Sequence, residues 1–162
     1  MRKITERQLH AFKRFLSVLP HGQDAELVLL KGHILIEEQV RTLIDRRLCN
    51  SKALCEPNAR LNCHQAIQLA KAFFPPDYQP ELWNAVAKLN TMRNDIAHNI
   101  LQRESLNDQI SAWVESFPTG FSDYTDKALR FEFTLWSLFD AMSELVDTPN
   151  AEVIHLAPDP KP

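Results

Sequence analysis

Residues 88–99, KLNTMRNDIAHN, carry side chains that can bind and cleave a phosphodiester within one predicted helix. Arg93 is always charged and offers a planar fork of donors that suits phosphate oxygens, and His98 can gain or lose a proton near neutral pH. Asn94 lies one turn before His98 and can hydrogen-bond an imidazole nitrogen or a substrate oxygen. Such groups can cleave RNA without a metal: a base takes the 2′-hydroxyl proton, the alkoxide attacks phosphorus, and a cation stabilises the phosphoryl oxygens.

The predicted helix at 81–100 has a core-facing stripe and a second, mixed sector when its residues are placed around a helical wheel. The second sector begins with Trp83 and Val86, whereas a solvated face would carry Lys and Glu. We therefore expect it to be buried or half-buried against a second subunit or a ligand, where the small Ala97 would allow close approach. The stripe contains Leu82, Ala85, Leu89, Met92 and Ile96, and the second sector continues through Asn90, Arg93, Asn94, Ala97 and His98.

Arg93 and His98 point in different directions from one straight helix, because five residues correspond to about 140° round the wheel. Both can reach one substrate through a distorted turn, through long side-chain reach or through a second protomer. The sequence leaves these three arrangements open.

The composition bounds the class of protein. With 162 residues, 44% of them hydrophobic and 24% charged, the chain can form one domain with a sizeable core. The formal net charge of −3 gives no global basic field, so contact with nucleic acid would need a local patch. No segment has the apolar run of a secretory signal or of a membrane span, so we expect a cytoplasmic protein with no membrane partner.

A basic stretch around the end of the second predicted helix is the candidate for such a patch. It could follow a phosphate backbone. It could also be a solvated helix end, since cations are favoured near the negative end of the helix dipole. The stretch comprises Arg41, Arg46, Arg47, Lys52 and Arg60.

Prolines and the scarcity of glycine, three in the chain, divide the sequence into segments with few strand-like alternations. We predict an all-α bundle of five to six helices, with Asp24 and Asp123 as N-caps. The helical domain covers 1–147, and a flexible, proline-rich tail covers 148–162. The predicted helices span 5–19, 24–48, 63–74, 81–100, 106–115 and 123–147.

The second predicted helix is apolar almost all round in its first half, as expected for the central helix of a bundle. Glu37 projects in a direction where burial costs free energy unless the carboxylate is paired. His33 and Arg41 lie four residues to either side and could supply that partner. Glu37 either fixes helix packing through an internal salt bridge or supports a site on another helix.

Three cysteines, Cys49, Cys55 and Cys63, are an odd number with irregular spacing, which argues against a disulfide framework and fits a reducing compartment. Together with His64, their spacing fits none of the zinc-binding patterns. We expect neither a metal nor a cofactor.

The segment LNTMRNDIAHN resembles the signature of HEPN domains, all-helical modules that share an Arg, a following polar residue and a His four to six positions after the Arg. The helix count, the long apolar second helix and the position of the signature after it extend the resemblance over most of 5–147. Many HEPN proteins are metal-independent ribonucleases, often toxins or antiviral effectors, and form homodimers that bring two copies of the motif into one cleft.

The resemblance implies a toxin-antitoxin or phage-defence endoribonuclease that acts on RNA at a composite homodimer cleft, with an antitoxin or regulatory protein as a further partner. Arg93 would bind and polarise the phosphate, Asn94 would orient groups in the cleft, and His98 would be the acid or base. Some HEPN toxins carry a modified Tyr two positions past the His, where this chain has Ile100. The supporting or substrate-binding candidates are Asn90, Asp95, Glu37 and Arg41.

Two other functions remain open. A HEPN-like module can bind a nucleotide, RNA or a protein partner without catalysis, because a fold does not determine chemistry. In a purely structural interpretation, Arg93 pairs with a carboxylate such as Glu37. His98 then satisfies the helix end, and Asn99 closes the helix.

Overall fold

The computed structural model describes residues 4–22, 24–98, 103–117, 119 and 124–149. Within these ranges the chain forms six α-helices and one short 3₁₀ helix and contains no strand, which confirms the predicted all-α bundle. The elements are α1 (Glu6–Val18), α2 (Ala25–Arg47), η1 (Ser51–Cys55), α3 (Cys63–Lys71), α4 (Pro80–His98), α5 (Arg103–Ser116) and α6 (Lys127–Asp147).

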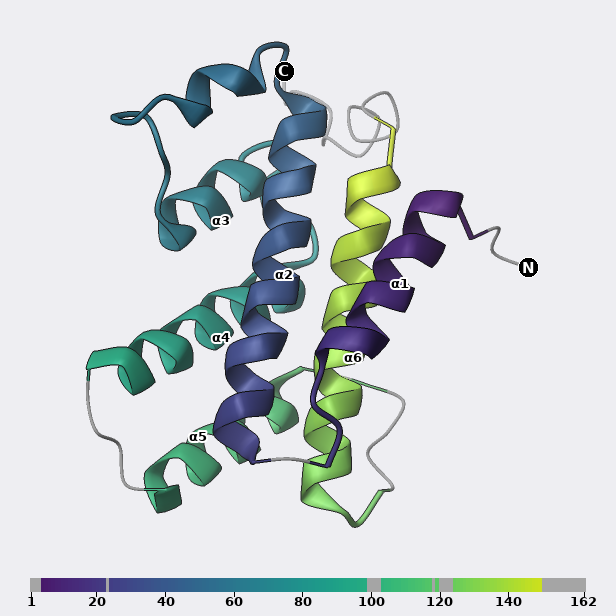
Figure 1. Cartoon of the computed structure of the whole chain (residues 1–162), viewed down its shortest axis with the longest axis vertical. Helices are drawn as coiled ribbons and strands as arrows, with labels where there is room; N and C mark the ends of the chain where they lie inside the picture. The colour runs from purple at the N-terminus through teal and green to yellow at the C-terminus, as the bar shows by residue number, and fades with distance from the viewer. Residues whose placement is uncertain (1–3, 23, 99–102, 118, 120–123, 150–162) are drawn as a thin grey trace, which may run out of the picture.

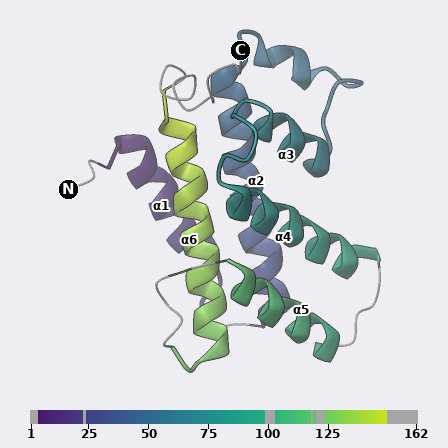
Figure 2. The same ribbon diagram turned by 180° about the vertical axis from the view of Figure 1, so that it is seen from behind.

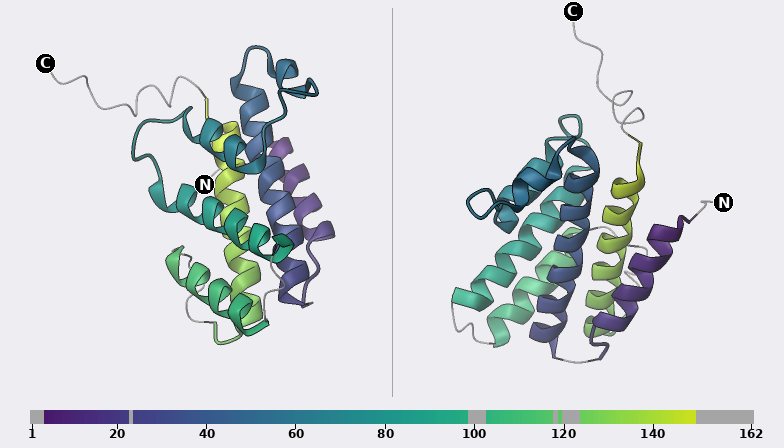
Figure 3. Two further views of the ribbon diagram at one scale, coloured as in Figure 1. Left: turned by 90° about the vertical axis from the view of Figure 1, so that its left-hand side faces the viewer. Right: turned by 45° about the horizontal axis from the view of Figure 1, so that its top comes forward.

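Two long helices, α2 and α6, lie side by side at the centre of the bundle and share its most extensive contact (Figures 1 and 2). α1 packs along the outer side of α6, whereas α3, α4 and α5 lie on the other side of the central pair (Figure 3). α2, α3 and α4 each contact the other two. These three helices therefore enclose one corner of the molecule, and the candidate site lies there.

Aspartate side chains cap two of the helices. The predicted cap Asp24 accepts a hydrogen bond from the amide of Glu26 at 2.9 Å, which confirms it. α6 begins later than predicted, because Asp126 is its N-cap and accepts from the amide of Ala128 at 2.9 Å. The predicted cap Asp123 lies outside the described residues.

α2 and α6 pack closely at Gly32. A Cβ added to this glycine would lie 2.8 Å from Cδ1 of Leu135 on α6, well inside contact distance. The side chain of Leu135 has no exposed surface, so it cannot move aside into solvent. The absence of a side chain at Gly32 therefore allows the close approach of the two central helices.

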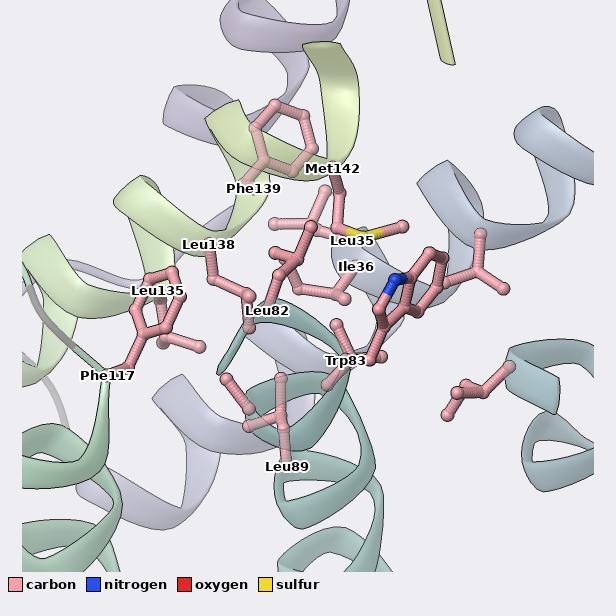
Figure 4. Packing of buried hydrophobic residues seen from close by; sticks show 14 of the residues in the cluster. Leu35, Ile36, Leu82, Trp83, Leu89, Phe117, Leu135, Leu138, Phe139 and Met142 are labelled. Carbon is pink, nitrogen blue, oxygen red and sulfur yellow. The ribbon is translucent and has the colours of Figure 1, made fainter. Parts of the chain in front are cut away.

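Trp83 and Val86 on α4 are buried within the chain, with 2% and 3% of their surface exposed. The ring of Trp83 lies 5.8 Å from that of Phe74, centroid to centroid. Figure 4 shows its indole in the same apolar cluster as Ile36 and Met142. The expectation that this end of the second sector faces a subunit or a ligand is therefore wrong. The segment after α3, which carries Phe74, covers it, and a helical wheel does not represent such neighbours.

The core-facing stripe predicted for this helix is confirmed. Its members belong to the same apolar cluster, between α4 and the central pair. Ile96 at the C-terminal end is half-buried, and the four buried members are Leu82, Ala85, Leu89 and Met92.

α6 ends at Asp147, directly before the predicted tail at 148–162. Thr148 and Pro149 are the described residues of that tail, and 150–162 lie outside the described ranges. None of the described helices combines the length and the apolar content that crossing a bilayer requires.

Gly32→Val should lower the free energy of unfolding by about 1–3 kcal/mol, because the new side chain overpacks the contact with Leu135. Lys31→Val is the matched control, since it places the same β-branched side chain at an exposed position of the same helix. Urea unfolding followed by circular dichroism measures both variants. An equal loss in the two would contradict the close-packing argument.

Candidate functional site

An open pocket of about 450 Å³ lies where α2, α3 and α4 meet, and its lining is mostly polar or ionisable. A slightly larger cavity, of about 500 Å³, lies mainly between α5 and the start of α6, but no described residue that lines it is a histidine or a cysteine. The candidate site is therefore the pocket at α2, α3 and α4. It is lined by His33, Glu37, Asn62, Cys63, His64, Asn90, Arg93, Asn94 and His98.

The pocket brings together most of the predicted site residues. Arg41 and Asp95 do not line it. Asp95 is half-buried on α4, and Arg41 borders a neighbouring hollow while its guanidinium contacts Glu37. Five of the seven predicted residues line the pocket, namely Glu37, Asn90, Arg93, Asn94 and His98.

His33 forms the buried floor of the pocket, with 4% of its surface exposed. Its Nε2 lies 3.2 Å from Oδ1 of Asn90 on α4. An amide oxygen only accepts, so Nε2 donates and Nδ1 is left as the acceptor nitrogen. Burial lowers the pKa of His33, and this outweighs the opposing effects of the Asn90 hydrogen bond and of Glu37. The ring is therefore neutral near pH 7.

Cys63, the first residue of α3, lies beside His33, with its Sγ 3.5 Å from Nε2 of the ring. Burial, with the nearby charge of Glu37, raises the pKa of the Cys63 thiol to about 11. The group is thus a thiol and not a thiolate at neutral pH.

Glu37 has the partner that the spacing predicts. Its Oε1 accepts hydrogen bonds from Nε and Nη2 of Arg41 at 2.9 and 2.6 Å, while Oε2 lies 3.9 Å from Nδ1 of His33. Nη2 of Arg41 also donates to the carbonyl of Leu61 at 3.1 Å. This ion pair therefore ties α2 to the segment that leads into α3. The salt-bridge interpretation of Glu37 is confirmed. Glu37 also lines the pocket, and its support of a site on another helix stays a prediction.

Arg93 and His98 lie at the exposed rim of the pocket, and Asn94 between them is half-buried. Nη1 of Arg93 donates to Oδ1 of Asn94 at 3.1 Å. Within the described part of the chain, the guanidinium of Arg93 makes no ion pair, in contrast to the pairing with Glu37 in the structural interpretation. Its charge is therefore available to an anion that enters the pocket. Ala97 is also exposed, so this half of the second sector is not buried in the single chain.

Arg93 and His98 line one pocket although α4 is a continuous helix from Pro80 to His98. A distorted turn is thus absent from this segment, and the width of the pocket accommodates the different directions of the two side chains. His98 is the last described residue of α4, and Asn99, predicted to close the helix, lies outside the described residues.

The basic stretch is largely engaged within the chain. Nη1 of Arg46 donates to Asp147 at 2.9 Å, and Nη2 of Arg47 donates to the carbonyl of Thr148 at 2.7 Å. The guanidinium of Arg47 also lies 5.2 Å from the ring centroid of Phe74. These arginines hold the end of α2 against the end of α6. They therefore do not form a continuous basic surface that is open to a phosphate backbone. Lys52 and Arg60, the last two residues of the stretch, are exposed.

Sequence reasoning assigned no site role to Cys63, Asn62 or His64 and treated His33 only as a partner for Glu37. The available signal was polarity on a buried face, because His33 and Asn90 interrupt apolar stripes on α2 and α4. Asn62 also starts α3 through a reciprocal capping box with Gln65, a pattern that the sequence contains.

Comparison with models of known protein families, with curated proteins and with solved structures finds no match to this chain. The functional proposal therefore rests on the side chains of the pocket and on the motif on α4.

The free energy of unfolding should fall as the pH drops below about 6.5, the ordinary pKa of histidine. The pKa of His33 is lowered in the native state, so below pH 6.5 the unfolded chain binds this proton first and stability rises with pH. The groups facing the ring are Asn90, Glu37, Cys63 and Arg93.

Urea unfolding at a series of pH values between about 5 and 7.5 measures this slope. His33→Gln should reduce it, because glutamine does not titrate. His64→Gln, at an exposed position on the same pocket, should retain it. An unchanged slope in His33→Gln would contradict the assignment.

Proposed function

We propose that this protein is a metal-independent endoribonuclease of the HEPN class, of toxin or phage-defence type, which cleaves RNA at a cleft between two copies of the chain. One observation carries the proposal: Arg93, Asn94 and His98 line a single open pocket large enough for a phosphate group and its neighbouring sugars. The all-helical bundle and the RNDIAH segment at the end of α4 support the same class.

The electrostatics of the pocket favour an anion at its rim. Arg93 has no carboxylate partner among the described residues, and a guanidinium can hold two phosphate oxygens at once. The histidine on the floor is neutral near pH 7, and Glu37 is paired with Arg41. A phosphate bound at Arg93 would therefore contact a permanently charged guanidinium. It would meet no uncompensated negative charge on the floor, because His33 is neutral and Glu37 is paired with Arg41.

The reaction would proceed by attack of the neighbouring 2′-oxygen on phosphorus. A neutral His98 takes the 2′-hydroxyl proton as the O2′–P bond forms, and Arg93 stabilises the charge on the phosphoryl oxygens. The P–O5′ bond breaks, and the leaving oxygen takes a proton from an acid. The products are a 2′,3′-cyclic phosphate and a 5′-hydroxyl.

A second copy of the chain would supply the acid. A neutral His98 that accepts a proton cannot donate one in the same step, so the His98 of the second copy serves as donor. Because Arg93, Ala97 and His98 are exposed, this part of α4 is accessible to another protomer. The contact would use the C-terminal half of α4, since Trp83 and Val86 are covered by the chain itself.

The purified protein should degrade RNA in the presence of EDTA and leave cyclic phosphate ends. His98→Ala should reduce the rate by about 10²–10⁴-fold, as expected for loss of a general acid or base. Arg93→Ala should reduce it by about 10²–10³-fold, as expected for loss of a group that stabilises the transition-state charge. Gel assays of RNA cleavage with end-group analysis measure both effects.

His10→Ala is the control, because His10 is exposed on α1 and does not line the pocket. Its helical signal, melting temperature and cleavage rate should match those of the unmodified protein. RNA binding without cleavage would instead support a non-catalytic HEPN-like module. A large loss of stability in His98→Ala or Arg93→Ala would support the structural interpretation.

Mixed dimers test whether the cleft is shared. If each cleft needs two copies of His98, co-expression of equal amounts of unmodified chain and His98→Ala should leave about one quarter of the activity, because random pairing makes one dimer in four fully intact. Independent sites would leave about one half, and that result would rule out the composite cleft.

A further inference from the structure

Three side chains with different metal-binding atoms converge on the floor of the pocket. His33 and Glu37 lie one turn apart on the same face of α2, and Cys63 reaches them from the start of α3. One ligand atom from each of the three lies within 4.8 Å of the other two. Imidazole nitrogen, thiolate sulfur and carboxylate oxygen together form a ligand set typical of zinc.

We propose that His33, Glu37 and Cys63 form a binding site for a thiophilic divalent metal ion of the Zn²⁺ type. This proposal does not depend on the proposed nuclease function, which uses Arg93, Asn94 and His98. It goes beyond the sequence expectation, because the cysteine pattern by itself predicts no metal.

The observed spacings suit a small tetrahedral ion. Typical zinc–sulfur and zinc–nitrogen bonds place neighbouring S and N ligands about 3.6 Å apart at a tetrahedral angle. Nδ1 of His33, the nitrogen that the hydrogen bond to Asn90 leaves as the acceptor, lies 3.9 Å from Oε2 of Glu37. Sγ of Cys63 lies 3.5 Å from Nε2, the other ring nitrogen, so the thiol must turn toward Nδ1 to share an ion with Glu37. Small side-chain movements would bring the three groups onto one ion.

The surrounding contacts hold these side chains in place before any ion arrives. Arg41 binds Oε1 of Glu37 and leaves Oε2 facing the histidine. Arg41 also binds the carbonyl of Leu61, and the capping box at Asn62 fixes the first turn of α3, where Cys63 lies. Supporting contacts of this kind orient metal ligands and raise affinity.

The chemistry of the ligands selects the class of metal. Mg²⁺ and Ca²⁺ prefer oxygen ligands alone, and of the three groups only Glu37 provides one. A thiolate and an imidazole favour Zn²⁺, with Co²⁺ as a close spectroscopic substitute. Binding replaces the thiol proton of Cys63, which leaves to solvent. Because the three groups line an open pocket, water can take the fourth position.

Titration of the metal-free full chain with Co²⁺ tests this site. One equivalent should produce a thiolate-to-cobalt charge-transfer absorption together with the visible bands of tetrahedral Co²⁺, and Zn²⁺ should displace them. Cys63→Ser should abolish the charge-transfer absorption. Glu37→Gln should weaken Zn²⁺ binding by about tenfold or more, measured by competition with a chromophoric chelator.

The double variant Cys49→Ser/Cys55→Ser is the matched control, because both cysteines are exposed and outside the cluster. It should retain the cobalt spectrum of the unmodified protein. Zn²⁺ should also raise the melting temperature of the control and not that of Cys63→Ser, since binding to the native state stabilises it. Circular dichroism checks that each variant is folded.

Two results would overturn the site: absence of the charge-transfer absorption in the unmodified protein, or its persistence in Cys63→Ser. RNA cleavage in EDTA, measured on the same preparations, separates the two proposals. A failed cobalt titration with intact cleavage would reject the metal site alone. A cobalt site without cleavage would reject the nuclease alone.

Discussion

A buried hydrogen bond between two helices sets the geometry of the pocket. His33 on α2 and Asn90 on α4 are nearly inaccessible to solvent, and a buried polar group without a partner costs about 1–3 kcal/mol. The bond satisfies Nε2 of His33 and Oδ1 of Asn90, and it thereby restrains the rotation of α4 against α2. Arg93, Asn94 and His98 follow Asn90 by three, four and eight residues, so they lie within about 80° of it round the helix, with Arg93 on one side and His98 on the other. Once Asn90 contacts His33, these side chains must extend toward the mouth of the same pocket.

The pocket combines a buried, neutral floor with an exposed, cationic rim. The floor contains the neutral imidazole of His33 and the protonated thiol of Cys63, and burial is the largest cause of both pKa shifts. The rim carries the charge of Arg93, which has no ion-pair partner among the residues that the structure describes. The two proposals divide along this line, because a soft metal suits the floor and a phosphate suits the rim. They share a cavity without sharing a residue.

Local sequence pattern was sufficient to predict the helices and the face of α4 that packs against the core. Prolines and apolar periodicity predicted the all-α bundle, and the core-facing stripe of α4 followed from spacing alone. Tertiary neighbours were not predictable in this way. The burial of Trp83 depends on the segment that carries Phe74, and the wheel of one helix contains no information about it.

The same limit explains why the cluster at the floor was missed. Zinc patterns are recognised from ligands that are close in sequence, whereas Cys63 follows His33 by thirty residues and joins it only through the packing of α3 on α2. The pairing of Glu37 was predictable, because Arg41 lies one turn away on the same helix. The contact between His33 and Asn90 spans fifty-seven residues and required the structure.

The proposed function depends most directly on RNA binding at the pocket formed by α2, α3 and α4. Histidine ring resonances, followed by NMR during titration with 2′-O-methyl RNA that cannot be cleaved by 2′-oxygen attack, test this claim directly. His64 and His98, which line the pocket, should shift, while His10 and His21, which do not line it, should stay unchanged. Shifts confined to His10 or His21, or no shift at His98 at saturating RNA, would contradict it.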